Sequence, residues 1–171
     1  LFIYFMLNII IFGKPGSGKG TQATIIKDKY SLQHISTGDV FRKNMSNKTD
    51  LGVLAKGYMD KGELVPDQVT VDMLSHEIDN FLPCNGFIFD GFPRTTFQAK
   101  ALDNLLSSES QKIDLIIALD VDNTTLTERL LQRGKSSGRA DDQSVEKINI
   151  RLQEYDNKTK RRIINKLLNF Y

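Results

Sequence analysis

A glycine-rich segment with the sequence GKPGSGKGT occupies Gly13–Thr21, directly after the first apolar run of the chain. Glycines let successive backbone N–H groups turn inward around a phosphate, and Lys19 adds a mobile positive charge. The stretch that follows carries apolar residues at helical spacing, at Ala23, Ile26 and Tyr30. A strand, a glycine-rich loop and a helix in this order form the setting of a P-loop, so we predict that the segment holds a chain of phosphates.

The position after the loop lysine bears on metal binding. It holds Gly20 where P-loops commonly carry the Ser or Thr that binds magnesium, and Thr21 comes one residue later. An acidic side chain must then contribute more to positioning a metal ion, and Asp90 and Asp120 both end apolar runs. Spacing does not choose between these two residues. The turn Gly91–Arg94 after Asp90 carries a cation and suits a phosphate site better, whereas Asp120 is at least as well explained as the cap of the next helix.

Six arginines lie after predicted strands or on the helices that follow them: Arg42, Arg94, Arg129, Arg133, Arg139 and Arg151. Arg129 and Arg133 are four residues apart on one predicted helix, where like charges repel unless an anion lies beside them. Arg139 follows the glycine-bounded segment Gly134–Gly138, which we expect to form a small mobile flap. A single arginine is best explained as a solvated surface charge, but the set beside a P-loop favours convergence on a polyphosphate.

No other group of side chains competes as a catalytic site. His34 and His76 are the only histidines and neither lies in a motif, so we expect His76 to be an exposed helix residue. Cys84 is the only cysteine, and we assign it a structural or incidental role. A single cysteine excludes an internal disulfide and a multi-cysteine zinc site, so we expect no zinc and a reducing, cytoplasmic location.

The composition is that of an ordinary globular domain. The 171 residues are 40% hydrophobic and 26% charged, and the net charge of +2 gives no reason to expect a nucleic-acid partner. The apolar residues 1–12 are too short to cross a bilayer and lack the features of a signal peptide, so we expect no membrane partner. Met6 resembles a natural start, and we treat Leu1–Phe5 as upstream sequence. No oligomerisation motif is evident, so we expect a monomer.

The order of the predicted elements indicates an α/β fold. Apolar runs predict four buried parallel strands, at Leu7–Phe12, Leu32–Ser36, Phe87–Asp90 and Leu115–Asp120. Apolar residues at helical spacing lie between or after them, at Leu51–Tyr58, Val71–Phe81 and Val145–Tyr155. Alternating strands and helices build right-handed βαβ units, and parallel sheets of this kind bind ligands beyond the carboxyl ends of their strands.

Five segments, in this order, resemble those of adenylate kinases of the short-lid type. They are GKPGSGKGTQ at Gly13–Gln22, HISTGDVFR at His34–Arg42, KGELVPD at Lys61–Asp67, GFIFDGFPRTTFQA at Gly86–Ala99 and ERLLQRGKSSGRADD at Glu128–Asp142. The resemblance covers about Met6 to Lys160 and implies the reaction ATP + AMP ⇌ 2 ADP with Mg²⁺. It implies a P-loop three-layer α/β/α core with a central parallel sheet, a helical AMP-binding insertion at residues 36–65 and a short lid at residues 132–142.

The resemblance assigns roles position by position. The ATP phosphates would contact Gly16, Ser17, Gly18, Lys19, Gly20 and Thr21, with Arg129 and Arg133 also on the ATP side. AMP would contact Thr37, Arg42, Glu63, Leu64, Val65, Gly91, Phe92, Pro93, Arg94, Gln98, Arg139 and Arg151. The catalytic cations would be Lys19, Arg94, Arg133, Arg139 and Arg151, and Asp90 would hold Mg²⁺ through water. The acceptor is a phosphate oxygen that is mostly deprotonated at pH 7, so no general base is expected.

The chain departs from the family pattern after Lys160. The proline, helix, last strand and final helix that are usual there are not recognisable, although apolar residues continue at helical spacing within residues 163–171. We therefore expect the last strand to be missing, Leu115–Asp120 to lie at an exposed sheet edge, and the chain to be less stable and to bind ATP more weakly than a complete relative.

Three alternatives remain open. The chain could be a nucleotide-binding protein impaired in catalysis, a UMP/CMP kinase, or a P-loop kinase for another small metabolite. Thr37 and Gln98 match the positions at which kinases for pyrimidine nucleotides usually differ, and they favour adenine.

Overall fold

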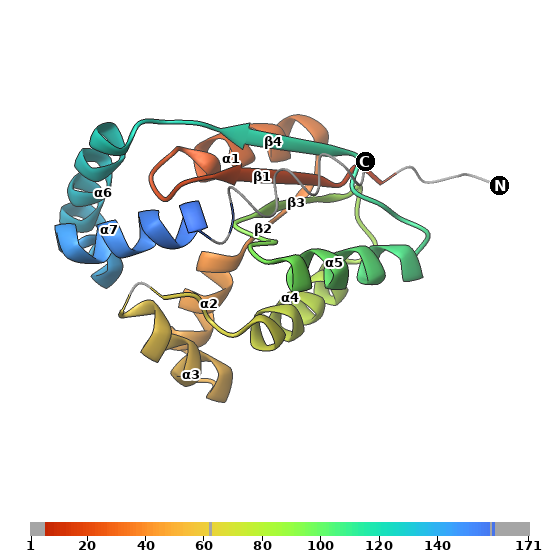
Figure 1. The fold of residues 1–171 in the computed structure, drawn as a ribbon. Helices are drawn as coiled ribbons and strands as arrows, with labels where there is room; N and C mark the ends of the chain where they lie inside the picture. The colour runs from red at the N-terminus through yellow and green to blue at the C-terminus, as the bar shows by residue number, and fades with distance from the viewer. Residues whose placement is uncertain (1–5, 62, 158, 160–171) are drawn as a thin grey trace.

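Four parallel strands form the centre of the structure, a computed structural model that describes residues 6–61, 63–157 and 159 (Figure 1). The strands are β1 (Ile9–Gly13), β2 (Gln33–Ser36), β3 (Phe87–Asp90) and β4 (Leu115–Leu119), in the spatial order β2-β3-β1-β4. In register, Ile10 lies beside Phe89 on one side and Ile116 on the other. The predicted parallel sheet is confirmed. The expectations for residues 1–5 and 160–171 lie outside the described residues.

The position of each strand in the sheet explains how far its residues are buried. All residues of β1 and β3 are buried, as expected for strands that have a neighbour on each side and helices on both faces. Within the described part of the chain β4 lies at the edge of the sheet, and its first residue, Leu115, is 48% exposed. The expected exposed edge is therefore present in this part of the chain.

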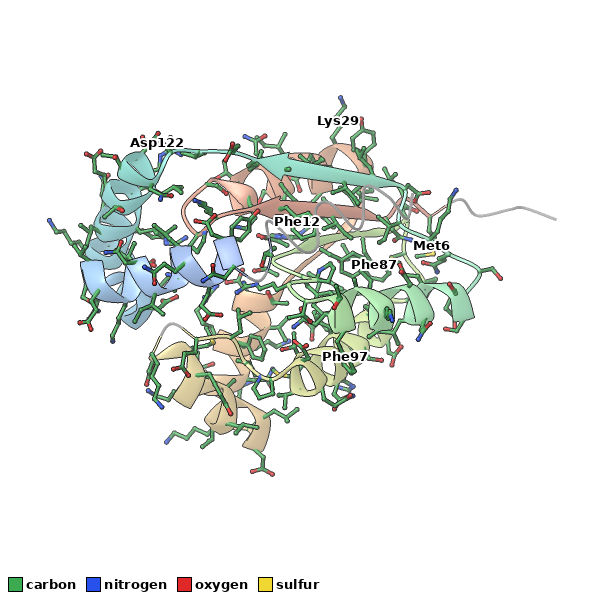
Figure 2. The ribbon with its side chains drawn as sticks, in the orientation of Figure 1. Met6, Phe12, Lys29, Phe87, Phe97 and Asp122 are labelled. Atoms are coloured by element: carbon green, nitrogen blue, oxygen red, sulfur yellow. The ribbon has the colours of Figure 1, made fainter. Side chains whose placement is uncertain are left out.

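Helices cover both faces of the sheet. They are α1 (Lys19–Tyr30), α2 (Thr37–Ser46), α3 (Asp50–Met59), α4 (Asp67–Phe81), α5 (Thr96–Ser108), α6 (Asn123–Ser137), the 3-10 helix η1 (Ala140–Asp142) and α7 (Val145–Glu154). Alternate residues of β1 enter two cores: Ile9 and Ile11 pack with Ala23 of α1, whereas Ile10 and Phe12 pack on the side of α4 and α5 (Figures 1 and 2). The three-layer α/β/α arrangement is confirmed. No helix of the described residues is long and apolar enough to cross a membrane.

Three of the four predicted strands have different boundaries, and β1 also extends one residue further, to Gly13. Leu7 and Asn8 precede β1 instead of belonging to it. The side chain of Asn8 accepts a hydrogen bond from Phe87 N at 3.1 Å and donates one to Lys112 O at 3.0 Å. Leu32 likewise precedes β2. The strand β4 ends at Leu119, so Asp120 lies outside it.

The cap of α6 also differs from the prediction. Asp122, not Asp120, is the N-cap, and its Oδ1 accepts a hydrogen bond of 2.8 Å from Thr125 N. The capping explanation of Asp120 is therefore wrong.

The segment expected to form a flap is largely helical. Gly134–Ser137 are the last turn of α6, and Gly138, with φ 65°, ends the helix in the left-handed conformation. The short helix η1 then turns the chain back against α6. At Gly134 a Cβ atom would lie 2.5 Å from Asp142 O, so glycine allows η1 to approach the helix.

The helices α2 and α3 form a hairpin beside the sheet, within the residues 36–65 proposed as an insertion (Figure 1). α2 starts where β2 ends, with Ser36 as its N-cap. Gly52 brings α3 close to α2: a Cβ atom there would lie 2.2 Å from Asn44 O. An added methyl group at Gly57, also in α3, meets open space.

These two glycines give a matched test of the hairpin. Gly52→Ala should lower the free energy of unfolding by about 1–3 kcal/mol, because the methyl group forces α3 away from α2. Gly57→Ala should raise it by about 0.5–1 kcal/mol, because alanine favours the helix and meets no neighbour. Urea unfolding of both variants measures the difference, and a Gly52→Ala protein as stable as wild type would contradict the packing.

Candidate active site

The glycine-rich loop joins β1 to α1 and leaves donors free at the start of the helix. Gly16 and Gly18 have φ values of 82° and 91°, a conformation that favours glycine. Gly18 is the N-cap of α1 and provides no side-chain cap. The N–H groups of the first turn therefore remain available to an anion, where the helix dipole also favours negative charge.

Lys19 is the first residue of α1, and its ammonium group lies under the loop. Its Nζ donates hydrogen bonds to Gly13 O at 2.8 Å and Lys14 O at 3.0 Å. Burial lowers the pKa of Lys19 to about 8, and the charges of Arg94 and Arg151 act in the same direction. The lysine is thus a partly desolvated charge that an anionic ligand would stabilise.

Most of the residues proposed for the site line one cavity of about 570 Å³. The cavity includes Gly16, Gly18, Lys19, Gly20, Thr21, Arg129 and Arg133 of the proposed ATP side, and Asp90. It also includes Thr37, Arg42, Glu63, Leu64, Val65, Gly91, Arg94, Gln98, Arg139 and Arg151 of the proposed AMP side. Sequence segments far apart along the chain thus meet at one hollow.

Three proposed residues do not line this cavity. Ser17 is 7% exposed, and its Oγ lies 2.3 Å from where a Cβ atom of Gly13 would be, so its side chain is beneath the loop. Phe92 is 1% exposed and belongs to the hydrophobic core, and Pro93 is also buried. The side chains of Ser17, Phe92 and Pro93 therefore do not face the cavity.

The turn after β3 holds Arg94 against the sheet. Arg94 Nε donates to Gly91 O at 2.7 Å, and the hydroxyl of Thr37 donates to the same oxygen at 3.1 Å. Gly91 has φ 79°, and a Cβ atom there would lie 2.8 Å from Thr37 Oγ1 and 3.0 Å from Arg94 Nη2. Burial, together with Arg151, lowers the pKa of Arg94. A buried guanidinium is therefore held at the carboxyl end of β3, next to other cations.

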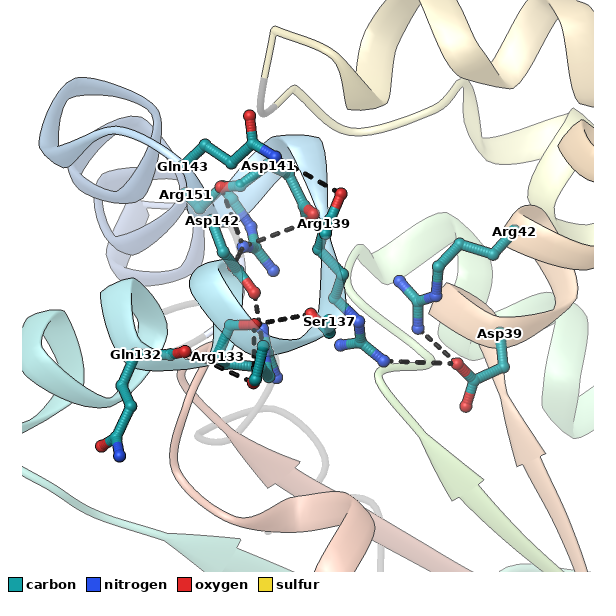
Figure 3. A network of polar contacts seen from close by, with 12 residues as sticks. Asp39, Arg42, Gln132, Arg133, Ser137, Arg139, Asp141, Asp142, Gln143 and Arg151 are labelled. Atoms are coloured by element: carbon teal, nitrogen blue, oxygen red, sulfur yellow. Dashed lines mark hydrogen bonds and ion pairs between the residues drawn. The ribbon is translucent and has the colours of Figure 1, made fainter.

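Two more arginines converge on Asp142 (Figure 3). Asp142 is completely buried; it accepts a hydrogen bond of 2.6 Å from Arg133 Nε and a second from Arg151 Nη1. Asp141 contacts Arg151 at 3.0 Å. Burial alone would raise the pKa of Asp142, but the hydrogen bond from Arg133 and the charge of Arg151 hold it below its usual value. Asp142 is thus an anion shared by Arg133 and Arg151, and sequence analysis assigned it no role.

Asp39 connects the two sides of the cavity. It forms an ion pair with Arg42 on its own helix, and its Oδ1 lies 3.7 Å from Arg139 Nη2, between α6 and η1 (Figure 3). Burial raises the pKa of Asp39, but the hydrogen bond and the charge of Arg42 together lower it by more, so the net shift is downward. The spacing of Asp39 and Arg42, three residues apart on a helix, is a signal that sequence analysis could have used.

The single acidic side chain that ends β3 fits a magnesium site completed by water and ligand oxygens. Asp90 lines the cavity and is 8% exposed. Its Oδ2 would lie 3.9 Å from a Cβ atom on Gly20, so the carboxylate faces the first turn of α1. In the part of the chain that the structure describes, no three His, Cys, Asp or Glu side chains gather as a metal site. Magnesium commonly binds through one or two carboxylates, with waters and substrate phosphates as the other ligands.

The two histidines and the cysteine lie as follows. His34, on β2, has its Nε2 3.4 Å from Asp90 Oδ2, a proximity that no motif indicated. His76 is exposed on α4, as predicted. Burial raises the pKa of the Cys84 thiol, which disfavours the reactive thiolate.

Raising the pH above 8 should weaken the binding of ATP, the ligand that the resemblance implies. Lys19 of the free site then loses its proton, whereas in the complex the negative phosphate oxygens keep Lys19 protonated. The Kd should therefore rise about tenfold per pH unit. Titration calorimetry between pH 7 and pH 9.5 measures this dependence. Lys19→Met should bind more weakly and show no such slope, and a wild-type Kd that stays constant above pH 8 would contradict the assigned role.

Asp142→Asn should lower the free energy of unfolding by about 2–4 kcal/mol, because it removes the buried carboxylate that Arg133 and Arg151 share. Asp141→Asn is the matched control, since Asp141 is partly exposed and contacts Arg151; its loss should cost less than about 1 kcal/mol. Chemical unfolding compares the two variants. Equal losses would show that Asp142 does not organise the arginines.

Comparison with known proteins bears on this site. The family model described as adenylate kinase matches residues 11–171, which includes residues 161–171, where sequence analysis recognised no family motif. A protein of Flavobacterium psychrophilum named adenylate kinase is 58% identical over 154 residues, which are 90% of this chain and 81% of that protein. Proteins of the same name from Flavobacterium johnsoniae and Parabacteroides distasonis are 54% and 51% identical over 90% of this chain, which cover 81% and 80% of those proteins. The chain belongs to the adenylate kinase family.

Proposed function

We propose that this chain transfers the terminal phosphoryl group of ATP to AMP, reversibly and with Mg²⁺, to give two molecules of ADP. The observation that carries the proposal is the single cavity in which the phosphate loop, Lys19 and six arginines meet. A cavity of this kind suits two phosphate-bearing ligands that react with each other. The names of the relatives support the same reaction.

The donor would bind along the loop between β1 and α1. Its phosphates would accept hydrogen bonds from the N–H groups of the loop and of the first turn of α1, with Lys19 on the β and γ phosphates. Arg129 and Arg133 also line the cavity and would add charge on the ATP side.

The acceptor would bind between α2, the turn after β3 and residues 63–65. Arg42 and Arg94 would hold its phosphate, and Gln98 and Thr37 would contact the base and sugar region. Arg42 must then exchange its ion pair with Asp39 for a contact with the phosphate. Residues 36–65 would act as the AMP-binding cover and residues 132–142 as the lid.

The chemistry needs positioning and charge stabilisation and no general base. Negative charge on the transferred group spreads over three oxygens, and Arg94, Arg139 and Arg151 surround the cavity from different elements. Two of these guanidinium groups are oriented before the ligand arrives. Gly91 O orients Arg94, and Asp141 and Asp142 orient Arg151. Prior orientation lowers the reorganisation needed in the transition state.

Asp90 would hold Mg²⁺ through water, and the ion would neutralise charge on the phosphate oxygens. Closure of the lid would exclude water that could otherwise hydrolyse ATP. We further propose that the chain acts as a monomer in a reducing compartment such as the cytoplasm, which its single cysteine supports.

A coupled assay with ATP, Mg²⁺ and one acceptor at a time tests the proposal. Wild type should turn over with AMP and far more slowly with CMP, UMP or GMP. Arg94→Ala should reduce kcat by about two orders of magnitude or more, because it removes a preoriented cation from the reacting phosphates. Lys29→Ala, on the outer side of α1 and away from the cavity, is the control and should leave turnover unchanged (Figure 2).

ATP binding without turnover of any acceptor would favour the impaired nucleotide-binding protein instead. Preferred turnover of CMP or UMP would favour the pyrimidine kinase. Near-normal rates in Arg94→Ala would remove that residue from the proposed mechanism.

A further inference from the structure

The side chain of Gln98 is held at both ends of its amide. It lines the cavity although only 2% of it is exposed. Its Nε2 donates to Asp67 Oδ1 at 2.8 Å, and its Oε1 accepts from Arg94 N at 2.7 Å. A carboxylate can only accept and a backbone N–H can only donate, so a single orientation of the amide satisfies both partners.

Asp67 is itself fixed in place. It is the first residue of α4, and its Oδ2 accepts a hydrogen bond of 2.7 Å from the hydroxyl of Thr95. Thr95 in turn is the N-cap of α5 and accepts from Gln98 N at 3.2 Å. The carboxylate therefore cannot rotate away from Gln98 without losing the contact that joins the starts of α4 and α5. Asp67 does not line the cavity, so it reaches a ligand only through Gln98.

The fixed amide still has one donor and one acceptor to offer. Nε2 keeps a second hydrogen and Oε1 a second lone pair. A 6-aminopurine presents a donor at its 6-amino group beside ring-nitrogen acceptors, and an amide pairs with that pattern oxygen to amino group and nitrogen to ring nitrogen. A 6-oxopurine presents an acceptor at position 6 beside a donor at N1, and an amide must turn over to pair with it.

We propose that Asp67 is a positioning residue that sets the preference of this site for a 6-aminopurine over a 6-oxopurine nucleoside monophosphate. The carboxylate favours the amide orientation that matches adenine and disfavours the reverse one, in which Oε1 would face the negative charge. The inference rests on the proposed function, in which Gln98 contacts the base of AMP.

AMP and IMP are the probes, because they differ at position 6 and in the proton on N1. The measurement is kcat/KM for each acceptor at saturating ATP, in wild type, Asp67→Asn and Asp72→Asn. Asp67→Asn keeps the size of the side chain but can present an N–H₂ group to Gln98, so the AMP-to-IMP ratio should fall about tenfold, the factor associated with one charge-assisted hydrogen bond. The change should appear in KM for the acceptor, with KM for ATP retained.

Asp72→Asn is the matched control on the same helix, where Asp72 is exposed and accepts a hydrogen bond from Gln68. It should keep the wild-type ratio. Should Asp67→Asn fail to fold, Asp67→Ser, which also removes the carboxylate, carries the same expectation. A merely structural role of Asp67 would lower stability and reduce both acceptors in proportion, leaving the ratio unchanged.

The outcomes separate the two proposals. A folded Asp67 variant with an AMP-to-IMP ratio within about twofold of wild type would overturn the inference while the proposed function stands. Absence of AMP turnover in wild type would overturn the proposed function and the inference with it.

Discussion

Burial and the like charges that share one cavity both disfavour the charged form of Lys19, Arg94 and Arg139, and they lower the pKa of these three residues. The pKa of Lys19 is lowered to about 8 chiefly by burial; the charge of Asp90 raises it, and the charges of Arg94, Arg151 and Arg133 lower it. Burial and neighbouring arginines also lower the pKa of Arg94 and Arg139. Gathering these groups costs free energy, which a polyanionic ligand returns on binding. The cavity is thus built for its ligand at some expense to the stability of the free protein.

A buried carboxylate, Asp142, and an exposed one, Asp39, make the arrangement possible. Asp142 holds Arg133 and Arg151 in fixed positions, and Asp39 lies between Arg42 and an arginine of the opposite side. These acids orient the guanidinium groups as well as offsetting their charge. The parallel sheet supplies the remaining geometry, because β1, β2 and β3 all end at the same edge and lead directly into the phosphate loop, α2 and the turn of Arg94.

Sequence reasoning succeeded where the determinants are local. The P-loop has its own strand and helix within a few residues, and the apolar runs of β1 and β3 show burial on both faces. It failed where a contact joins distant segments. No periodicity connects Arg133 with Asp142, because Gly138 ends the helix between them, and none connects Gln98 with Asp67 on another helix.

Two differences from the sequence analysis have a physical origin in local sequence. The segment Gly134–Gly138, expected to form a small flap, is mostly the last turn of α6, because Gly134 serves close packing against η1 and only Gly138 ends the helix. At the start of α6 two acids compete for the cap, and the choice of Asp122 over Asp120 depends on where β4 ends. Strand ends depend on pairing with β1, which composition alone does not specify.

The central claim is that these preoriented cations transfer a phosphoryl group between two bound nucleotides and keep water out. Supplying ADP alone with Mg²⁺ tests it most directly, because both products then arise from one substrate. ³¹P nuclear magnetic resonance should show ATP and AMP forming in equal amounts from ADP, without inorganic phosphate. Release of inorganic phosphate, or no conversion of ADP, would contradict the account.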